Sequence, residues 1–150
     1  MFITYFIFYK FLQLLFFLNI NYISSTVTSF TFSSCGSDSD IAQNIQLAVD
    51  PPLPQDNYIL YLNADFSKEI TKGTSKYSIT YNFIPLSPTI NDLCTEIQNS
   101  NISCPLDNHI SSQSNGNIPV GVSGTTIITN EWINEDNNRI LCMKFNIKTN

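Results

Sequence analysis

The stretch SKYSITYNF, residues 75–83, decides the fold. Its large apolar side chains, Tyr77, Ile79, Tyr81 and Phe83, alternate strictly with polar ones. Successive side chains of a β-strand point to opposite faces, so this alternation is typical of a strand with one buried face. The stretch therefore predicts a half-buried strand over residues 75–83.

Outward from this stretch, the same period of two recurs along the chain. Further strands are expected at residues 30–32, 45–49, 58–66, 125–133 and 141–147. Turn signals rich in Pro, Gly, Asn and Asp separate them at residues 50–54, 72–73, 85–88, 115–117 and 135–138. No long helix is indicated. Six to eight short strands predict an all-β fold, either a sandwich or a small barrel.

The cysteines predict disulfides and no metal site. Cys35 and Cys142 bracket nearly the whole mature chain, whereas Cys94 and Cys104 close a small inner loop. Zinc sites usually contain a close pair of ligands from one tight turn, and this sequence has none. Four cysteines allow three connectivities. We adopt the nested pairing, 35 with 142 and 94 with 104, because it needs the fewest geometric coincidences.

Residues 1–25 predict a secretory signal peptide, followed by one mature domain over residues 26–150. The densest apolar run is 11–18, and cleavage after Ser25 fits best, with Ser24 or Val27 only slightly less suitable. The alternative is an uncleaved anchor, because the apolar stretch approaches the roughly 20 residues that span a bilayer. Cleavage would place the disulfides in an oxidising compartment, outside the cell or in the endolysosomal lumen.

The charge pattern argues against a nucleic-acid partner. Without the leader, six basic residues stand against twelve acidic ones. The basic residues are scattered singly among acids, whereas phosphate binding needs clustered Lys and Arg. An acidic chain is likewise unsuited to stable docking on anionic lipid.

The sequence lacks the parts of an enzyme. His109, the single histidine, is expected in an exposed polar loop, and no G-x-S-x-G elbow or free thiol accompanies it. Gly116, Gly121 and Gly124 are not followed by the residues of a phosphate-binding loop and are expected in turns. Glu135 and Asp136 fit a solvated hairpin tip. We therefore expect no catalytic residue, no metal and no cofactor.

Six motifs, in the correct order over residues 30–148, resemble the ML-domain lipid-recognition family. They are residues 32–36 (FSSCG), 51–54, 70–73 (ITKG), 92–94 (DLC), 104–106 (CPL) and 141–142 (LC). The closest likeness is to the phosphatidylglycerol/phosphatidylinositol transfer proteins. The Niemann-Pick type sterol carriers are similar too, at Glu131-Trp132 and Leu141-Cys142, although that branch usually has six cysteines.

This resemblance implies an immunoglobulin-like sandwich whose two sheets part around an apolar cavity, with the disulfide pairing adopted above. It also implies lipid binding and transfer between membranes, with phosphatidylglycerol, phosphatidylinositol or a sterol as cargo, transient membrane contact and a monomeric carrier. Departures at residues 107–109 and 122–123 leave ligand choice open. The candidate cavity residues are Phe66, Tyr77, Ile79, Tyr81, Phe83, Ile84, Leu86, Val120, Val122 and Trp132.

Two further expectations complete the sequence interpretation. The rival to a carrier is a secreted immunoglobulin-like recognition module with a fully packed core; against it, Trp132 follows both inner cysteines, whereas immunoglobulin domains place Trp between the paired cysteines. Asn101-Ile102-Ser103 is an N-glycosylation sequon inside the 94–104 loop.

Overall fold

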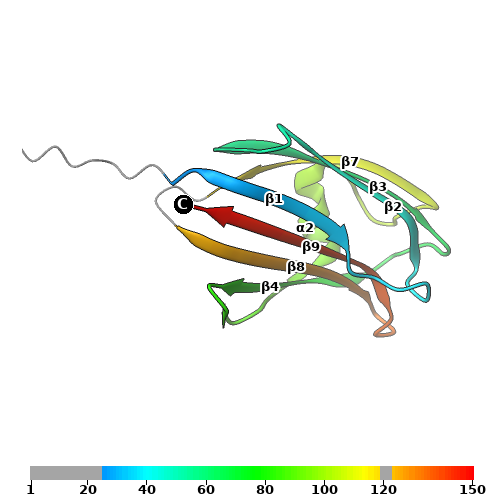
Figure 1. Cartoon of the computed structure of the whole chain (residues 1–150). Helices are drawn as coiled ribbons and strands as arrows, with labels where there is room; N and C mark the ends of the chain where they lie inside the picture. Colours follow the sequence, from blue (N-terminus) through cyan, green and yellow to red (C-terminus); the bar gives the residue numbers. More distant parts are fainter. Residues whose placement is uncertain (1–24, 119–122) are drawn as a thin grey trace, which may run out of the picture.

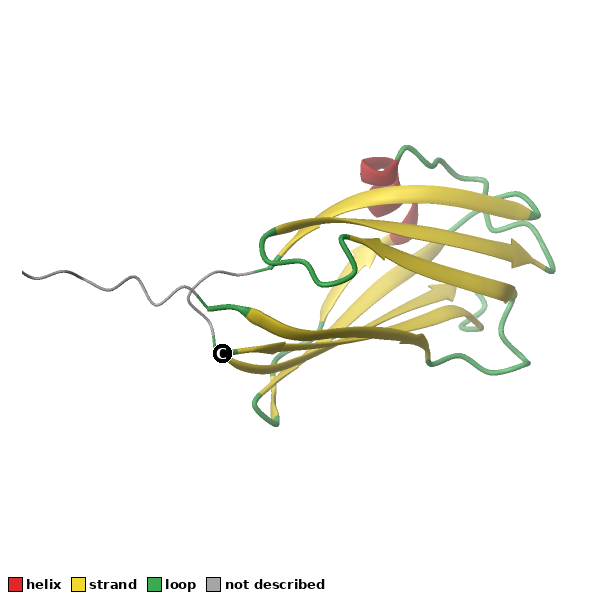
Figure 2. Ribbon diagram, turned by 45° about the horizontal axis from the view of Figure 1, so that its top comes forward, coloured by secondary structure: helices red, strands yellow, loops and turns green. Residues whose placement is uncertain are grey.

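A computed structural model describes residues 25–118 and 123–150 of the chain. The expected signal peptide, apart from Ser25, and the candidate residues Val120 and Val122 lie outside the described residues. The described part forms two antiparallel β-sheets packed face to face, the all-β sandwich expected from the sequence (Figures 1 and 2).

The larger sheet has the strand order β1-β9-β8-β4-β5. Its sixth strand, β6, also pairs with β4, along residues 74–77. Its strands are β1 (Val27–Ser34), β4 (Gly73–Tyr81), β5 (Ile84–Pro85), β6 (Thr89–Asp92), β8 (Gly124–Asn134) and β9 (Arg139–Thr149). The smaller sheet has the order β2-β3-β7, made of β2 (Ala42–Asp50), β3 (Asn57–Phe66) and β7 (His109–Asn117).

Strand registers determine which side chains share the inner face of the larger sheet. Tyr81 pairs with Thr126, Ile79 with Ile128, and Ser75 with Trp132. On the next strand, β9 aligns Phe145 with Ile128. Because side chains alternate, every second residue of β4, β8 and β9 points toward the smaller sheet.

One short helix covers an edge of the sandwich. Helix α2 (Leu93–Ile97) begins at Asp92, whose side chain accepts a hydrogen bond of 2.8 Å from the Thr95 N–H, and continues into the 3₁₀ turn η1 (Gln98–Ser100). The helix buries Leu93 and Ile97. No helix in the described part of the chain is long and apolar enough to cross a membrane.

Two disulfides connect the cysteines in the nested pattern. Cys35 is bonded to Cys142, next to a backbone hydrogen bond of 3.0 Å between the same residues, and Cys94 is bonded to Cys104. The first bridge ties the end of β1 to the start of β9. The second closes the loop that contains α2 and η1.

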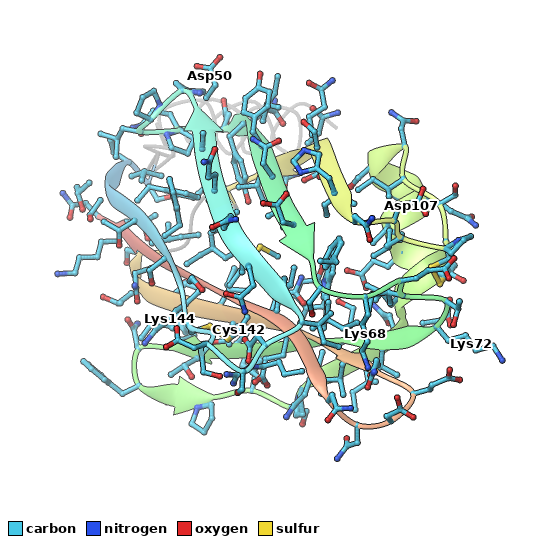
Figure 3. The ribbon with its side chains drawn as sticks, turned by 90° about the vertical axis from the view of Figure 1, so that its right-hand side faces the viewer. Asp50, Lys68, Lys72, Asp107, Cys142 and Lys144 are labelled. Atoms are coloured by element: carbon cyan, nitrogen blue, oxygen red, sulfur yellow. A yellow bond between two sulfur atoms is a disulfide. The ribbon has the colours of Figure 1, made fainter. Side chains whose placement is uncertain are left out.

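The two ends of the sandwich differ in packing. At the end that holds the 35–142 disulfide, Phe66, Leu93, Trp132 and Leu141 are each at most 5% exposed. Figure 3 looks onto this closed end, with Lys72 pointing out into solvent. At the other end lie the β4–β5 hairpin, the start of β1 and the C-terminus (left in Figure 1). There, Tyr58, Leu60 and Ile79 are only partly buried.

Most strand predictions are confirmed, but some local predictions are wrong. Residues 115–117 and His109 were expected in turns or loops, whereas they form β7, paired along its whole length with β3. Its sequence, HISSQSNGN, is polar because only one face of the strand is covered. The strand forms through its backbone pairing with β3. Phe83 was expected within the strand, but β4 ends at Tyr81 and Phe83 lies in the hairpin turn.

Candidate functional site

A cavity in two lobes lies between the sheets toward the open end. The inner lobe has a volume of about 400 Å³ and the mouth lobe about 290 Å³. The mouth lobe reaches the strand ends at Tyr81, Ile118 and Thr149. Both lobes are lined by Tyr58, Ile79, Ile128 and Ile147, so the two spaces share one apolar wall.

This wall is formed from both sheets. Ile79, Ile128 and Ile147 come from neighbouring strands of the larger sheet, and Tyr58 comes from β3. The ring of Tyr58 packs edge-on against Phe30, with centroids 5.4 Å apart. The ring also lies so close to Gly116, its partner on β7, that a Cβ at that position would overlap it. Gly116 is thus required by the position of Tyr58 and not by a turn.

The inner lobe ends at a polar cluster. Tyr77 donates a hydrogen bond to the Glu96 carboxylate of α2, and Ser75 Oγ lies 3.2 Å from the same Glu96 oxygen and 3.0 Å from Asn130 Oδ1. Asn91 Nδ2 donates to the other Glu96 oxygen at 3.0 Å. These bonds attach α2 to the inner face of the larger sheet.

Burial, together with the Glu96 carboxylate, raises the pKa of Tyr77 far above its usual value of 10.0. Burial also raises the pKa of Tyr58. Both phenols are therefore neutral at physiological pH. The described residues that line the two lobes include no Asp, Glu, Lys, Arg or His. The cavity can accept apolar chains and neutral polar groups, but it offers no counter-charge to an ion.

Four candidate residues line the cavity. Tyr77 and Ile79 line the inner lobe, and Ile79, Tyr81 and Leu86 line the mouth lobe. The Tyr81 hydroxyl donates to the Ser123 carbonyl at 2.6 Å, which joins the mouth to the segment before β8. Their contact with a lipid stays a prediction.

Four other candidates lie outside both lobes. Phe66 and Trp132 have the alternation expected of inner-face residues, but they are packed in the closed end, each 5% exposed. Phe83 and Ile84 are 91% and 63% exposed on the hairpin. These four residues miss the cavity because of their positions along the chain. Alternation identifies the face of a strand on which a residue lies, but not where along the strand the two sheets separate.

Several lining residues were not among the candidates, although their alternation was recognised as strand. They come from β3, β8 and β9. In the larger sheet the signal that could have identified them is strand pairing, because β8 aligns with Ile79 and Tyr77 and β9 aligns with β8. The residues of β3 belong to the other sheet, and no such pairing marks them. The lining residues from these three strands are Tyr58, Leu60, Ile128, Asn130, Met143, Phe145 and Ile147.

The single histidine lies away from the cavity. His109 Nδ1 is 2.7 Å from Asp65 Oδ1, and Asn44 donates to the other Asp65 oxygen at 2.8 Å. The neighbouring Ile110 is buried toward the core, so His109 faces outward from β7. Within residues 25–118 and 123–150, no group of three or more His, Cys, Asp or Glu could hold a metal ion.

Comparison with protein families gives one match over most of the chain. The model of the ML domain matches residues 29–149. A curated protein of Dictyostelium discoideum, "Putative phosphatidylglycerol/phosphatidylinositol transfer protein 3", is 25% identical over 134 residues, which cover 86% of this chain and 87% of the relative. These matches confirm the resemblance inferred from the motifs.

Two solved structures have the same fold. Chicken MD-1, crystallised in complex with lipid IVa, superposes with a TM-score of 0.56 at 16% identity, covering 83% of this chain and 96% of MD-1. A Niemann-Pick type C2 protein from the Japanese carpenter ant superposes with a TM-score of 0.53 at 19% identity, covering 77% and 96%. At these identities the likeness shows the fold alone.

Proposed function

Because this chain belongs to the ML-domain family, we propose that it is a secreted lipid carrier and not an enzyme. It takes a phospholipid, phosphatidylglycerol or phosphatidylinositol, from one membrane, holds the acyl chains between its sheets and releases the lipid to another membrane. The curated relative named as a transfer protein for these two lipids supports this choice of cargo.

The observation that carries the proposal is the cavity of two lobes with one shared apolar wall. Each lobe is within or close to the range of roughly 300–1,000 Å³ typical of ligand sites. Sheets of a sandwich normally pack about 10 Å apart with their core filled by side chains. Each methylene group that leaves water for such a space contributes about 0.8 kcal/mol.

The absence of charge among the described lining residues supports one orientation of a bound phospholipid. A phosphate moved into this space would lose its hydration without gaining a counter-ion, which is strongly unfavourable. The headgroup therefore stays in water at the open end, and the acyl chains enter first.

Two features support action outside the cytosol. The disulfides are stable in oxidising compartments, such as the extracellular space and the endolysosomal lumen. The apolar leader expected over residues 1–25 would direct the chain there. Loss of secretion on deletion of residues 2–23 would test this part of the proposal.

A sterol is the second candidate cargo, because the cavity is uncharged and the Niemann-Pick type C2 fold is shared. The recognition module without cargo requires a fully packed core, and the two lobes argue against it.

The test is native mass spectrometry of the secreted protein, followed by extraction of bound lipid and measurement of lipid transfer between vesicles. A bound phospholipid and faster exchange are expected. A sterol in the extract would change the cargo, and a protein that stays lipid-free after incubation with mixed vesicles would overturn the carrier.

Two neighbouring residues of β8 provide a matched pair of variants. Ile128→Trp fills the wall shared by both lobes, and it should lower lipid loading about tenfold. Ile127→Trp places the same ring on the opposite face of the strand, and loading should be unchanged. Equal loading by the two variants would show that lipid binds elsewhere.

A further inference from the structure

Three of the five large apolar side chains that are exposed among the described residues lie in one short segment of the chain. Phe83, Ile84 and Leu86 are 91%, 63% and 51% exposed, and they follow directly on β4. We call these three residues the apolar tip. Exposed apolar clusters on a soluble protein usually mark a contact surface.

The backbone presents the tip at a steric cost. Asn82 and Phe83 form a two-residue hairpin loop and have φ values of 46° and 68°. Consecutive left-handed residues make the type I′ turn, which normally has Gly at the second position. A Phe held in this conformation while 91% exposed is the kind of strained, exposed residue that is associated with function.

The hairpin is held firmly to its neighbours. Asn82 exchanges two hydrogen bonds of 2.8 Å with Thr125, one through its backbone N–H and one through its side-chain oxygen. The Leu86 N–H donates to the Ile79 carbonyl at 2.8 Å. The tip is therefore a projection whose backbone needs little ordering when it meets a partner.

The tip is continuous with the cavity. Leu86 lines the mouth lobe together with Tyr81, the last residue of β4. An apolar surface thus extends from the inner wall over the rim to Phe83. A lipid chain that leaves a bilayer along this surface avoids water.

The charge pattern identifies the partner as a lipid surface. The chain has a formal net charge of −5, yet no Asp or Glu occurs from Ile70 to Asn91, and the tip itself is uncharged. Insertion of the tip among acyl chains buries no charge. A stable second copy would need about 20–30 contact residues on each side, far more than these three side chains supply.

We propose that the apolar tip inserts into the interfacial region of a bilayer and places the mouth of the cavity against the membrane. This inference rests on the proposed lipid-carrier function and names the element that performs the membrane contact. Aromatic and aliphatic side chains at the water boundary of a bilayer stabilise such docking.

The test measures binding of the full mature protein to vesicles of phosphatidylcholine, which carry no net charge, by flotation. Ile84→Ser and Ile90→Ser form a matched pair, because each isoleucine is 63% exposed but only Ile84 belongs to the apolar tip, whereas Ile90 lies on β6. Ile84→Ser, alone or with Phe83→Ser, should weaken vesicle binding and transfer about tenfold. Ile90→Ser should leave both unchanged.

A second measurement uses Trp as a depth reporter in a Trp132→Phe background. Trp in Phe83→Trp should be quenched by brominated lipids, whereas Trp in Ile90→Trp should not. Equal vesicle binding by wild type and the Phe83→Ser/Ile84→Ser variant would overturn the proposal. So would a wild-type dimer in solution that this variant converts to a monomer. Loading with a soluble short-chain phosphatidylglycerol separates the two proposals. The tip variants should still bind this lipid, because binding from solution requires no membrane contact. If neither the wild type nor the tip variants bound it, the carrier function itself would be refuted.

Discussion

Arg139 Nε lies 3.0 Å from both carboxylate oxygens of Asp40, although the two residues are 99 positions apart in the chain. The Asp40 side chain is only 3% exposed, and Ser37 Oγ donates a further hydrogen bond at 3.0 Å. Burial by itself would raise the pKa of Asp40, but the hydrogen bonds from Arg139 and Ser37 outweigh it and the pKa falls below 3.8. The ion pair fixes the closed end of the sandwich beside the 35–142 disulfide.

Asp40→Asn should reduce the free energy of unfolding by about 2 kcal/mol at pH 7. A carboxyl group whose pKa is depressed in the folded state stabilises the protein above its unfolded pKa, and this stability is lost as pH falls through the folded pKa. Urea titrations should therefore show the difference from wild type closing below pH 3.8. Asp136→Asn, which removes an exposed pair with Lys68, serves as the control and should change stability by less than about 0.5 kcal/mol.

Gly116→Val should displace the Tyr58 ring into the cavity, because a side chain at this position overlaps the ring. We expect lipid loading to fall about tenfold and the melting temperature to drop. Tyr58→Leu in the same protein should restore part of the loading. Gln113→Val, on the exposed side of β7, is the control. Normal loading by Gly116→Val would mean that Tyr58 does not border the bound lipid.

The raised pKa of Tyr77 predicts a loss of stability in alkali. The unfolded chain ionises this tyrosine near pH 10, whereas the folded protein keeps it neutral against Glu96, so its contribution is present below pH 10 and falls as pH rises further. Tyr77→Phe should lower stability by about 1 kcal/mol at pH 7 and flatten the decline between pH 10 and 11. Denaturant midpoints measured across this range test the expectation. An unchanged slope in Tyr77→Phe would assign the decline to other groups.

Asn101 should carry an N-glycan when the chain is made in a secretory pathway. Its side chain is exposed at the end of η1, in the loop closed by the 94–104 disulfide. This loop follows β6, whose Asp92 pairs with Thr74, seven residues and about 23 Å along β4 from the mouth at Tyr81. Treatment with an N-glycanase should lower the mass of wild type but not of Ser103→Ala, and lipid loading should be equal in both. Reduced loading by the glycosylated form would place the glycan near the entrance.

Strand periodicity made much of the fold predictable from sequence. Alternation at residues 75–81, 58–66 and 141–147 gives each strand its buried face without reference to any partner, because a strand's two faces follow from backbone geometry alone. The nested bridges were the pairing adopted among three possible connectivities, and the structure confirms it. β7 could not be predicted from alternation, because its polar residues form a strand only through hydrogen bonds to β3.

What only the tertiary structure decided is how the alternating residues divide between packed core, cavity and surface. Phe66, Ile79 and Phe83 all continued an apolar alternation, yet one is packed at the closed end, one lines the cavity and one projects into solvent. The sequence by itself determined a set of strands with one apolar face each and an acidic chain. The point along the strands at which the two sheets separate depends on contacts between residues far apart in the chain, such as Phe30 with Tyr58 and Ser75 with Glu96. A local sequence pattern contains no information about such contacts.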